Sequence, residues 1–149
     1  SDTGMLMARY PQPTAQAAYL DDSSPNLGAI YENVIAQELT AQGIPLYYYM
    51  AKKHGEVDFI ADTNADSVMP FEVKSGRSYR THAAIDAVLA NAEYRISQGV
   101  VLSRSNIAQD GGTTYLPLYA TYCLRDVCNL ASPSTVSTIG DFSLTVHPV

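Results

Sequence analysis

Apolar residues recur at intervals of three and four between positions 27 and 42, which is typical of an amphipathic helix. Gly43 follows at the position where helices commonly end on a left-handed residue. A second helix is expected over residues 83–92, where Ile85 and Val88 would share one face. Both helices therefore have an apolar side that must pack against another layer.

Short strand patterns lie between and after these helices. The segment 56–62 alternates apolar and acidic residues, the period of a half-buried strand. A proline-containing run from Tyr115 leads into a last helical segment that extends towards Val127. The expected strands are 46–50, 56–62, 68–74 and 96–102. Helix, three strands, helix, strand and helix predict one α/β domain with a small mixed β-sheet flanked by helices.

The two ends of the chain differ from this central part. A short helix is expected to stop before Pro11, the stretch 12–22 is expected to be a loop, and 24–26 offers a helix N-cap. Ser, Thr, Pro and Gly dominate from Leu130 onward, where only a short strand near 142–146 is expected. The resulting division is 1–24 as the remnant of a preceding region, 25–128 as the domain and 129–149 as a tail.

Composition narrows the protein class. Hydrophobic residues make up 46% and charged residues 16% of 149 residues, which indicates a globular chain. No apolar run reaches the roughly 18 residues of a membrane helix, and no secretory signal is visible, so we expect a cytoplasmic protein without a membrane partner. Cys123 and Cys128 lack the spacing of a zinc site and are interpreted as idle thiols. The net charge of −6 disfavours tight binding to DNA by this domain alone.

Acidic residues and one lysine occur at matching places on two neighbouring strands. Glu72 and Lys74 are two residues apart, so both side chains point to the same face. If the two strands form a hairpin, Asp58 comes within reach of Glu72. Converging carboxylates repel each other, and a hard divalent cation such as Mg²⁺ relieves that repulsion. Glu32, beside the apolar face of the first helix, is expected to overhang the strand ends and complete the site.

Other charged residues are weaker candidates for a role in this site. Glu56 shares the strand face of Asp58 and is assigned a supporting role, while Arg77 and Arg80 are candidates for phosphate contacts. A solvated ion pair between Glu72 and Lys74, worth under about 1 kcal/mol, is the alternative for that pair. Exposed strand and helix positions are the alternatives for Asp58 and Glu32, and plain surface charge for the two arginines.

Three segments together resemble a known superfamily. Tyr-Glu-Asn-Val-Ile at 31–35, Glu-Val-Asp-Phe-Ile at 56–60 and Phe-Glu-Val-Lys-Ser at 71–75 are similar to PD-(D/E)XK nucleases. More narrowly, residues 2–123 resemble a domain of unknown function at the C-terminal end of many prokaryotic AAA-type ATPases. The opening segment 1–6 and the segment 115–119 take part in this narrower likeness.

The resemblance implies a restriction-endonuclease-like fold and a metal-dependent site. In that family pattern Asp58 and Glu72 match the metal-binding acids, Lys74 the catalytic lysine, and Glu32 the helix-borne acid. Mg²⁺ or Mn²⁺ is the expected cofactor and DNA the expected partner. An ATPase region would precede the domain, and no G-x-x-x-x-G-K-[ST] phosphate loop occurs in this sequence.

Two hypotheses follow for function. The first is a Mg²⁺-dependent DNA phosphodiesterase, a hydrolase whose catalytic residues are Asp58, Glu72 and Lys74. The second is a catalytically silent module that binds nucleic acid or protein for an ATPase. Net acidity favours the second hypothesis, and the presence of all four polar residues of the pattern favours the first.

Overall fold

The computed structural model describes residues 3–9, 11–19, 27–51, 55–130 and 147–148. Its centre is a sheet of seven strands in the order β5-β6-β4-β3-β2-β1-β7. The strands are β1 (Tyr47–Ala51), β2 (Gly55–Asp62), β3 (Val68–Lys74), β4 (Gly99–Ser103), β5 (Ala108–Asp110), β6 (Thr113–Pro117) and the two-residue β7 (His147–Pro148). The α/β class and the mixed sheet are thus confirmed.

Parallel and antiparallel pairs divide the sheet into two parts. β1, β2 and β3 pair antiparallel, whereas β3, β4 and β6 run parallel to one another. Lys74 pairs with Ser103, and Ser103 pairs with Pro117. The carboxyl ends of the three parallel strands therefore form one row along a single edge of the sheet.

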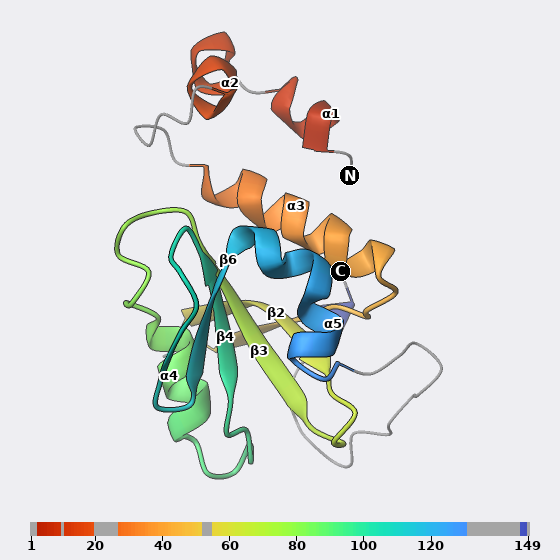
Figure 1. Ribbon diagram of the computed structural model, residues 1–149, viewed down its shortest axis with the longest axis vertical. Coiled ribbons are helices and arrows are strands. Elements are labelled where there is room, and N and C mark those ends of the chain that lie inside the picture. Colours follow the sequence, from red (N-terminus) through yellow and green to blue (C-terminus); the bar gives the residue numbers. More distant parts are fainter. Residues whose placement is uncertain (1–2, 10, 20–26, 52–54, 131–146, 149) are drawn as a thin grey trace.

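Helices cover both faces of the sheet (Figure 1). On one face lie α3, the 3-10 helix η1 and α5, and on the other lies α4, because their buried residues belong to different clusters of the core. Two further helices, α1 and α2, lie beyond α3, away from the sheet (Figure 1). The helix bounds are α1 (Thr3–Met7), α2 (Gln12–Tyr19), α3 (Gly28–Ala41), α4 (Ala83–Ala90), η1 (Leu118–Cys123) and α5 (Leu124–Val127).

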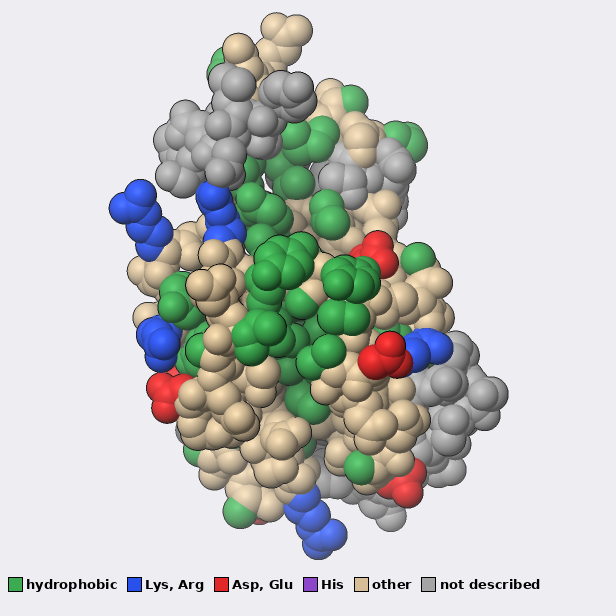
Figure 2. Space-filling model, viewed as in Figure 1, with side chains coloured by type: hydrophobic (Ala, Val, Ile, Leu, Met, Phe, Trp, Pro, Cys, Tyr) green, Lys and Arg blue, Asp and Glu red, His purple; other side chains and the backbone are tan. Residues whose placement is uncertain are grey.

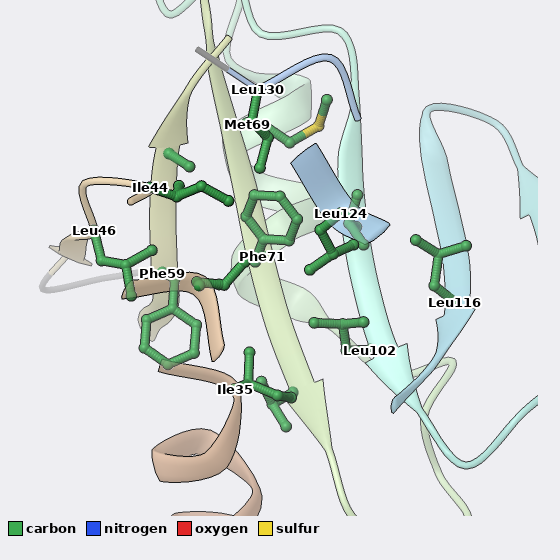
Figure 3. Packing of buried hydrophobic residues seen from close by; sticks show 14 of the residues in the cluster. Ile35, Ile44, Leu46, Phe59, Met69, Phe71, Leu102, Leu116, Leu124 and Leu130 are labelled. Carbon is green, nitrogen blue, oxygen red and sulfur yellow. The ribbon is translucent and has the colours of Figure 1, made fainter. Parts of the chain in front are cut away.

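The larger part of the core lies between the sheet and the α3 side. Phe71, on the central strand β3, and Leu102, on β4, are fully buried there. Leu39 of α3 and Leu124 of α5 belong to the same cluster. Figure 3 shows Phe71 in the middle of this cluster, with Leu124 and Leu102 beside it. This packing fixes α3, which carries Glu32, against the strands that carry the other acids.

Apolar side chains also gather on the outside of this layer. Figure 2 shows them over the region of η1 and α3. Tyr119 and Tyr122 are each at least 70% exposed, and Val34 of α3 is 44% exposed.

The two cysteines, Cys123 and Cys128, lie near the same helices and are free thiols. Burial raises the pKa of Cys128 to about 12, and the charge of Cys123 adds to this effect.

Most predicted elements are confirmed, with small shifts of their ends. The helix expected over 27–42 is α3, and Gly43 has the left-handed φ of 71° expected after it. The strand expected over 96–102 begins three residues later, as β4. The predicted N-cap at 24–26 and the strand near 142–146 lie outside the described residues.

Three expectations for secondary structure were wrong or incomplete. The stretch 12–22, expected to be a loop, contains the helix α2, since Ala and Gln favour helix and Pro13 is tolerated in a first turn. Two strands were not predicted. The residues of β5, Ala-Gln-Asp, show no strand pattern, and β6 includes the start of the proline-containing run that was expected only to lead into a helix. β2 is not evenly half-buried, because its last four residues are all buried.

Within the described residues, no helix is both long enough and apolar enough to cross a membrane.

A close approach of two loops gives a prediction about Gly112. A Cβ atom at Gly112 would lie 2.5 Å from the carbonyl oxygen of Ser97. This oxygen belongs to the backbone, so the main chain itself would have to move to relieve the clash. We expect Gly112→Ala to lower the free energy of unfolding by about 1–3 kcal/mol, as overpacking does. Gly76→Ala is the matched control, because nothing lies within 4 Å of its Cβ. Equal denaturation midpoints for the two variants would contradict the prediction.

Candidate functional site

An irregularity in β2 occurs at Asp58. Tyr47 is paired with Ile60 and Tyr49 with Val57, so the single residue Tyr48 lies opposite two residues of β2. These two residues, Asp58 and Phe59, form a β-bulge, which redirects side chains locally. As a result Val57 and Ile60, three residues apart, pack into the same cluster on the α4 side.

The bulge brings the Asp58 side chain between β2 and β3. The paired register of these strands runs from Asp62 opposite Val68 to Phe59 opposite Phe71. Directly beyond it, the backbone N–H of Val73 donates a hydrogen bond of 2.7 Å to Oδ2 of Asp58. β2 and β3 therefore form the hairpin on which the expected approach of Asp58 to Glu72 depended, and the Asp58 carboxylate lies beside the Glu-Val-Lys segment.

Glu72 and Lys74 form an ion pair through Oε1 of Glu72. Their neighbours Phe71 and Val73 belong to the core on the α3 side, so Glu72 and Lys74 point to the other face. The pair is not fully solvated, because Glu72 is only 6% exposed. Its second oxygen, Oε2, is buried and has no hydrogen-bond partner. A buried carboxylate oxygen without a partner is costly and suited to a cation.

Electrostatic interactions connect five residues from three elements. Burial raises the pKa of Asp58 to about 6, the Val73 N–H opposes this, and the charges of Glu32 and Glu72 add to it. Burial also raises the pKa of Glu32, with repulsion from Glu56 adding to the effect and Lys74 opposing it. We call Glu32, Glu56, Asp58, Glu72 and Lys74 the acid–lysine cluster.

The acid–lysine cluster contains carboxylate oxygens, the type of donor that Mg²⁺ prefers. Four carboxylates and one ammonium leave three net negative charges when all are ionised. Among the described residues, no three acidic, histidine or cysteine side chains converge closely enough to hold a metal ion by themselves. One or two carboxylates with water and a phosphate oxygen are the usual set for Mg²⁺, so Asp58 and Glu72 fit that ion.

The two arginines proposed for phosphate contacts differ in their surroundings. Arg77 is exposed, three residues after Lys74. Arg80 instead lies over the rings of Tyr79 and Tyr115, and its Nη1 is 3.5 Å from Oδ2 of Asp110. Arg80 is thus partly neutralised by the protein itself, which leaves Arg77 as the stronger candidate.

One buried histidine has no sequence spacing that indicates a ligand or catalytic role. His82 is 6% exposed, and its Nε2 lies 2.6 Å from the Tyr115 hydroxyl. Its Nδ1 lies 2.9 Å from a carboxylate oxygen of Asp86. The contact with Tyr115 joins residues 33 positions apart, so no local spacing could reveal it. The contact of His82 with Tyr115 therefore connects the start of α4 to β6.

The raised pKa of Asp58 gives a prediction about stability and pH. The folded-state pKa of about 6 lies above the ordinary value of 3.8, so the folded protein binds more protons than the unfolded chain between these values. The contribution of Asp58 to stability therefore falls as the pH rises from about 4 to about 6. Asp58→Asn removes this loss while its amide oxygen can still accept the Val73 N–H.

We expect Asp58→Asn to be more stable relative to the unsubstituted protein at neutral pH than at pH near 4. Chemical denaturation of both proteins at the two pH values, with EDTA present, measures this difference. A stability difference that does not change with pH would show that the Asp58 carboxyl is not perturbed by folding.

Comparison with known proteins gives one positive result. Residues 27–121 match the family model of the domain of unknown function DUF4143. This segment begins one residue before α3 and ends within η1, so it contains the whole acid–lysine cluster. No curated protein and no solved structure matches the chain. Because the matched segment covers more than half of its length, the chain belongs to the DUF4143 family.

Proposed function

We propose that this domain hydrolyses phosphodiester bonds of DNA with a divalent cation, Mg²⁺ or Mn²⁺. The observation that carries the proposal is the buried Oε2 of Glu72, which lacks a partner while Asp58 is held beside its strand by Val73. A buried carboxylate oxygen without a partner, beside a second desolvated carboxylate, favours a bound cation over an empty site. The resemblance of the same residues to the PD-(D/E)XK pattern adds support.

The residues of the acid–lysine cluster would divide the chemistry among them. Asp58 and Glu72 would hold the cation, which polarises a phosphoryl oxygen and lowers the pKa of a bound water. Lys74, already beside Glu72, would neutralise negative charge that develops on the phosphate or orient the attacking water. Glu32 and Glu56 would strengthen the negative potential that attracts the cation.

A second function is favoured by the overall charge. The net charge of −6 opposes the approach of DNA, and a catalytically silent binding module would not need to bring a scissile phosphate to the acid–lysine cluster. The likeness to C-terminal domains of AAA-type ATPases supports a protein partner of that kind for either function. In the silent module, the ion pair of Glu72 and Lys74 would have a structural role only.

Nicking of supercoiled plasmid tests the first function against the second. The protein is incubated with plasmid and Mg²⁺ or Mn²⁺, with EDTA as one control and Asp58→Asn as the other. We expect nicking that requires the metal and that is lost in Asp58→Asn. Nicking that persists at the same rate in Asp58→Asn would indicate a contaminating nuclease, and folded protein without any nicking would favour the silent module.

A further inference from the structure

A pocket lies between β1 and the helix α4, outside the acid–lysine cluster. Its volume is about 270 Å³, below the roughly 300–1,000 Å³ of sites for drug-sized ligands, so it suits one small ring system. One lining residue, Val88, is buried and another, Ala90, is exposed, so the pocket reaches from the core to the surface. We call it the tyrosine pocket. It is lined by Tyr49, Ala87, Val88, Ala90, Asn91 and Tyr94.

Two tyrosine rings form one wall of the tyrosine pocket. The hydroxyl oxygens of Tyr49 and Tyr94 lie 2.9 Å apart, and their rings meet edge to face with centroids 6.0 Å apart. Burial, followed by the hydrogen bond with Tyr94, raises the pKa of Tyr49 to about 12. The Tyr49 hydroxyl therefore keeps its proton at neutral pH, and the contact between the two hydroxyls holds an uncharged aromatic wall in place.

The remaining walls are apolar apart from one amide. None of the lining residues carries a charge at neutral pH, so the tyrosine pocket does not suit a free phosphate or a metal ion. Oδ1 of Asn91 accepts the backbone N–H of Glu93 at 3.0 Å, which orients the amide and leaves its Nδ2 donors for a ligand. Nucleobases stack on tyrosine rings, and their edges pair with asparagine amides. A nucleobase therefore matches the lining in size, charge and hydrogen-bonding groups.

The tyrosine pocket borders the strand that carries Asp58. Tyr49 pairs with Val57 in the register of β1 and β2, and Asp58 follows Val57 directly. Paired strands lie about 4.8 Å apart, so the backbone of Tyr49 is one strand spacing from the bulge. The helix α4 packs over the same strand, because Val88 and Val57 belong to one cluster of the core. A DNA strand with a base in the pocket would therefore run close to the candidate metal site.

We propose that the tyrosine pocket binds one unpaired base of the DNA, so that the substrate of this domain is single-stranded or locally unpaired DNA. This inference rests on the proposed function and names its substrate class. A base inside a duplex reaches such a pocket only if it leaves the stack and its partner. Stacking also suits a chain with a net charge of −6, because it needs no cation on the protein, whereas contacts with the DNA backbone do.

Binding of fluorescent oligonucleotides tests the tyrosine pocket without any catalysis. Affinities for a single strand of mixed sequence and for the matching duplex are measured by anisotropy, with EDTA present. We expect the unsubstituted protein to prefer the single strand. Ala90→Leu fills the pocket from its exposed side, and it should weaken binding of the single strand by about 5- to 150-fold, the equivalent of one lost base stack.

Ala83→Leu is the matched control for this substitution. Ala83 is also exposed on α4, but it does not line the tyrosine pocket, so its variant should bind the single strand as the unsubstituted protein does. If Ala90→Leu binds as tightly as Ala83→Leu, or if the unsubstituted protein prefers the duplex, the role of the pocket is wrong. Metal-dependent nicking of plasmid would still support the proposed function in that case. A protein that neither binds nor nicks DNA would contradict both proposals.

Discussion

Lys74→Ala should lower the rate of metal-dependent nicking by at least about a hundredfold, the usual cost of removing one group that stabilises charge in a transition state. Lys74 is the only cation within the acid–lysine cluster, where it pairs with Glu72. Asp58 and Glu72 remain in this variant, so the binding of Mn²⁺ should persist. Nicking rates and Mn²⁺ affinities of the same preparations separate the two effects.

Glu72→Gln is the companion variant for this experiment. It removes the carboxylate that has the unpartnered oxygen, so both Mn²⁺ binding and nicking should be lost. A Lys74→Ala protein that nicks at the original rate would contradict the role of Lys74. A Lys74→Ala protein that loses Mn²⁺ binding as well would make Lys74 a residue that supports the metal site and not one that acts in the reaction.

Phe71→Ala should lower the free energy of unfolding by about 3–5 kcal/mol, the usual cost of truncating a buried aromatic residue. Phe71 is fully buried on β3 and lies in the middle of the larger core cluster (Figure 3). Domains of this kind have a total stability of about 5–15 kcal/mol, so the loss is a large share. Denaturation in urea measures the change.

Tyr119→Ala provides the control for this substitution. Tyr119 is also aromatic, but it is 74% exposed on η1, so its removal should change the stability by no more than about 0.5 kcal/mol. Equal losses in the two variants would contradict the description of the core. A Phe71→Ala chain that fails to fold, beside a folded Tyr119→Ala chain, would agree with it.

Much of the fold could be predicted because local patterns determine it. The interval of three and four residues in α3 and the apolar runs in β3 and β4 each identified an element close to its observed bounds. The strands β5 and β6 and the helix α2 were not found. β5 is held by its pairing with β6, and the sequence of its own three residues does not indicate this contact.

The residues of the candidate site could be selected from the sequence, but their arrangement could not. The two-residue spacing of Glu72 and Lys74 predicts a shared face, and the structure has their side chains in contact. The bulge at Asp58 depends on how β1 and β2 pair, and no local pattern in 56–62 indicates it. The contact of Arg80 with Asp110 joins residues 30 positions apart, so no local pattern indicates that the charge of Arg80 is partly neutralised.

The tyrosine pocket shows a similar limit. The strand that carries Tyr49 and the helix α4 were both expected from the sequence, but nothing in either segment indicates that they form a pocket. Tyr49 and Tyr94 are 45 positions apart, and the contact of their hydroxyls follows from how α4 and the turn after it pack on the sheet. Topology, which is set by contacts distant in sequence, therefore decides which residues can act together.

Calorimetric titration with Mn²⁺ tests most directly whether Asp58 and Glu72 bind a divalent cation, on which the proposed hydrolysis depends. We expect saturable binding of one ion per chain in the unsubstituted protein and its loss in Asp58→Asn and in Glu72→Gln, each shown to be folded by circular dichroism. Folded protein that binds no Mn²⁺, or that binds it equally well in both variants, would contradict the metal site.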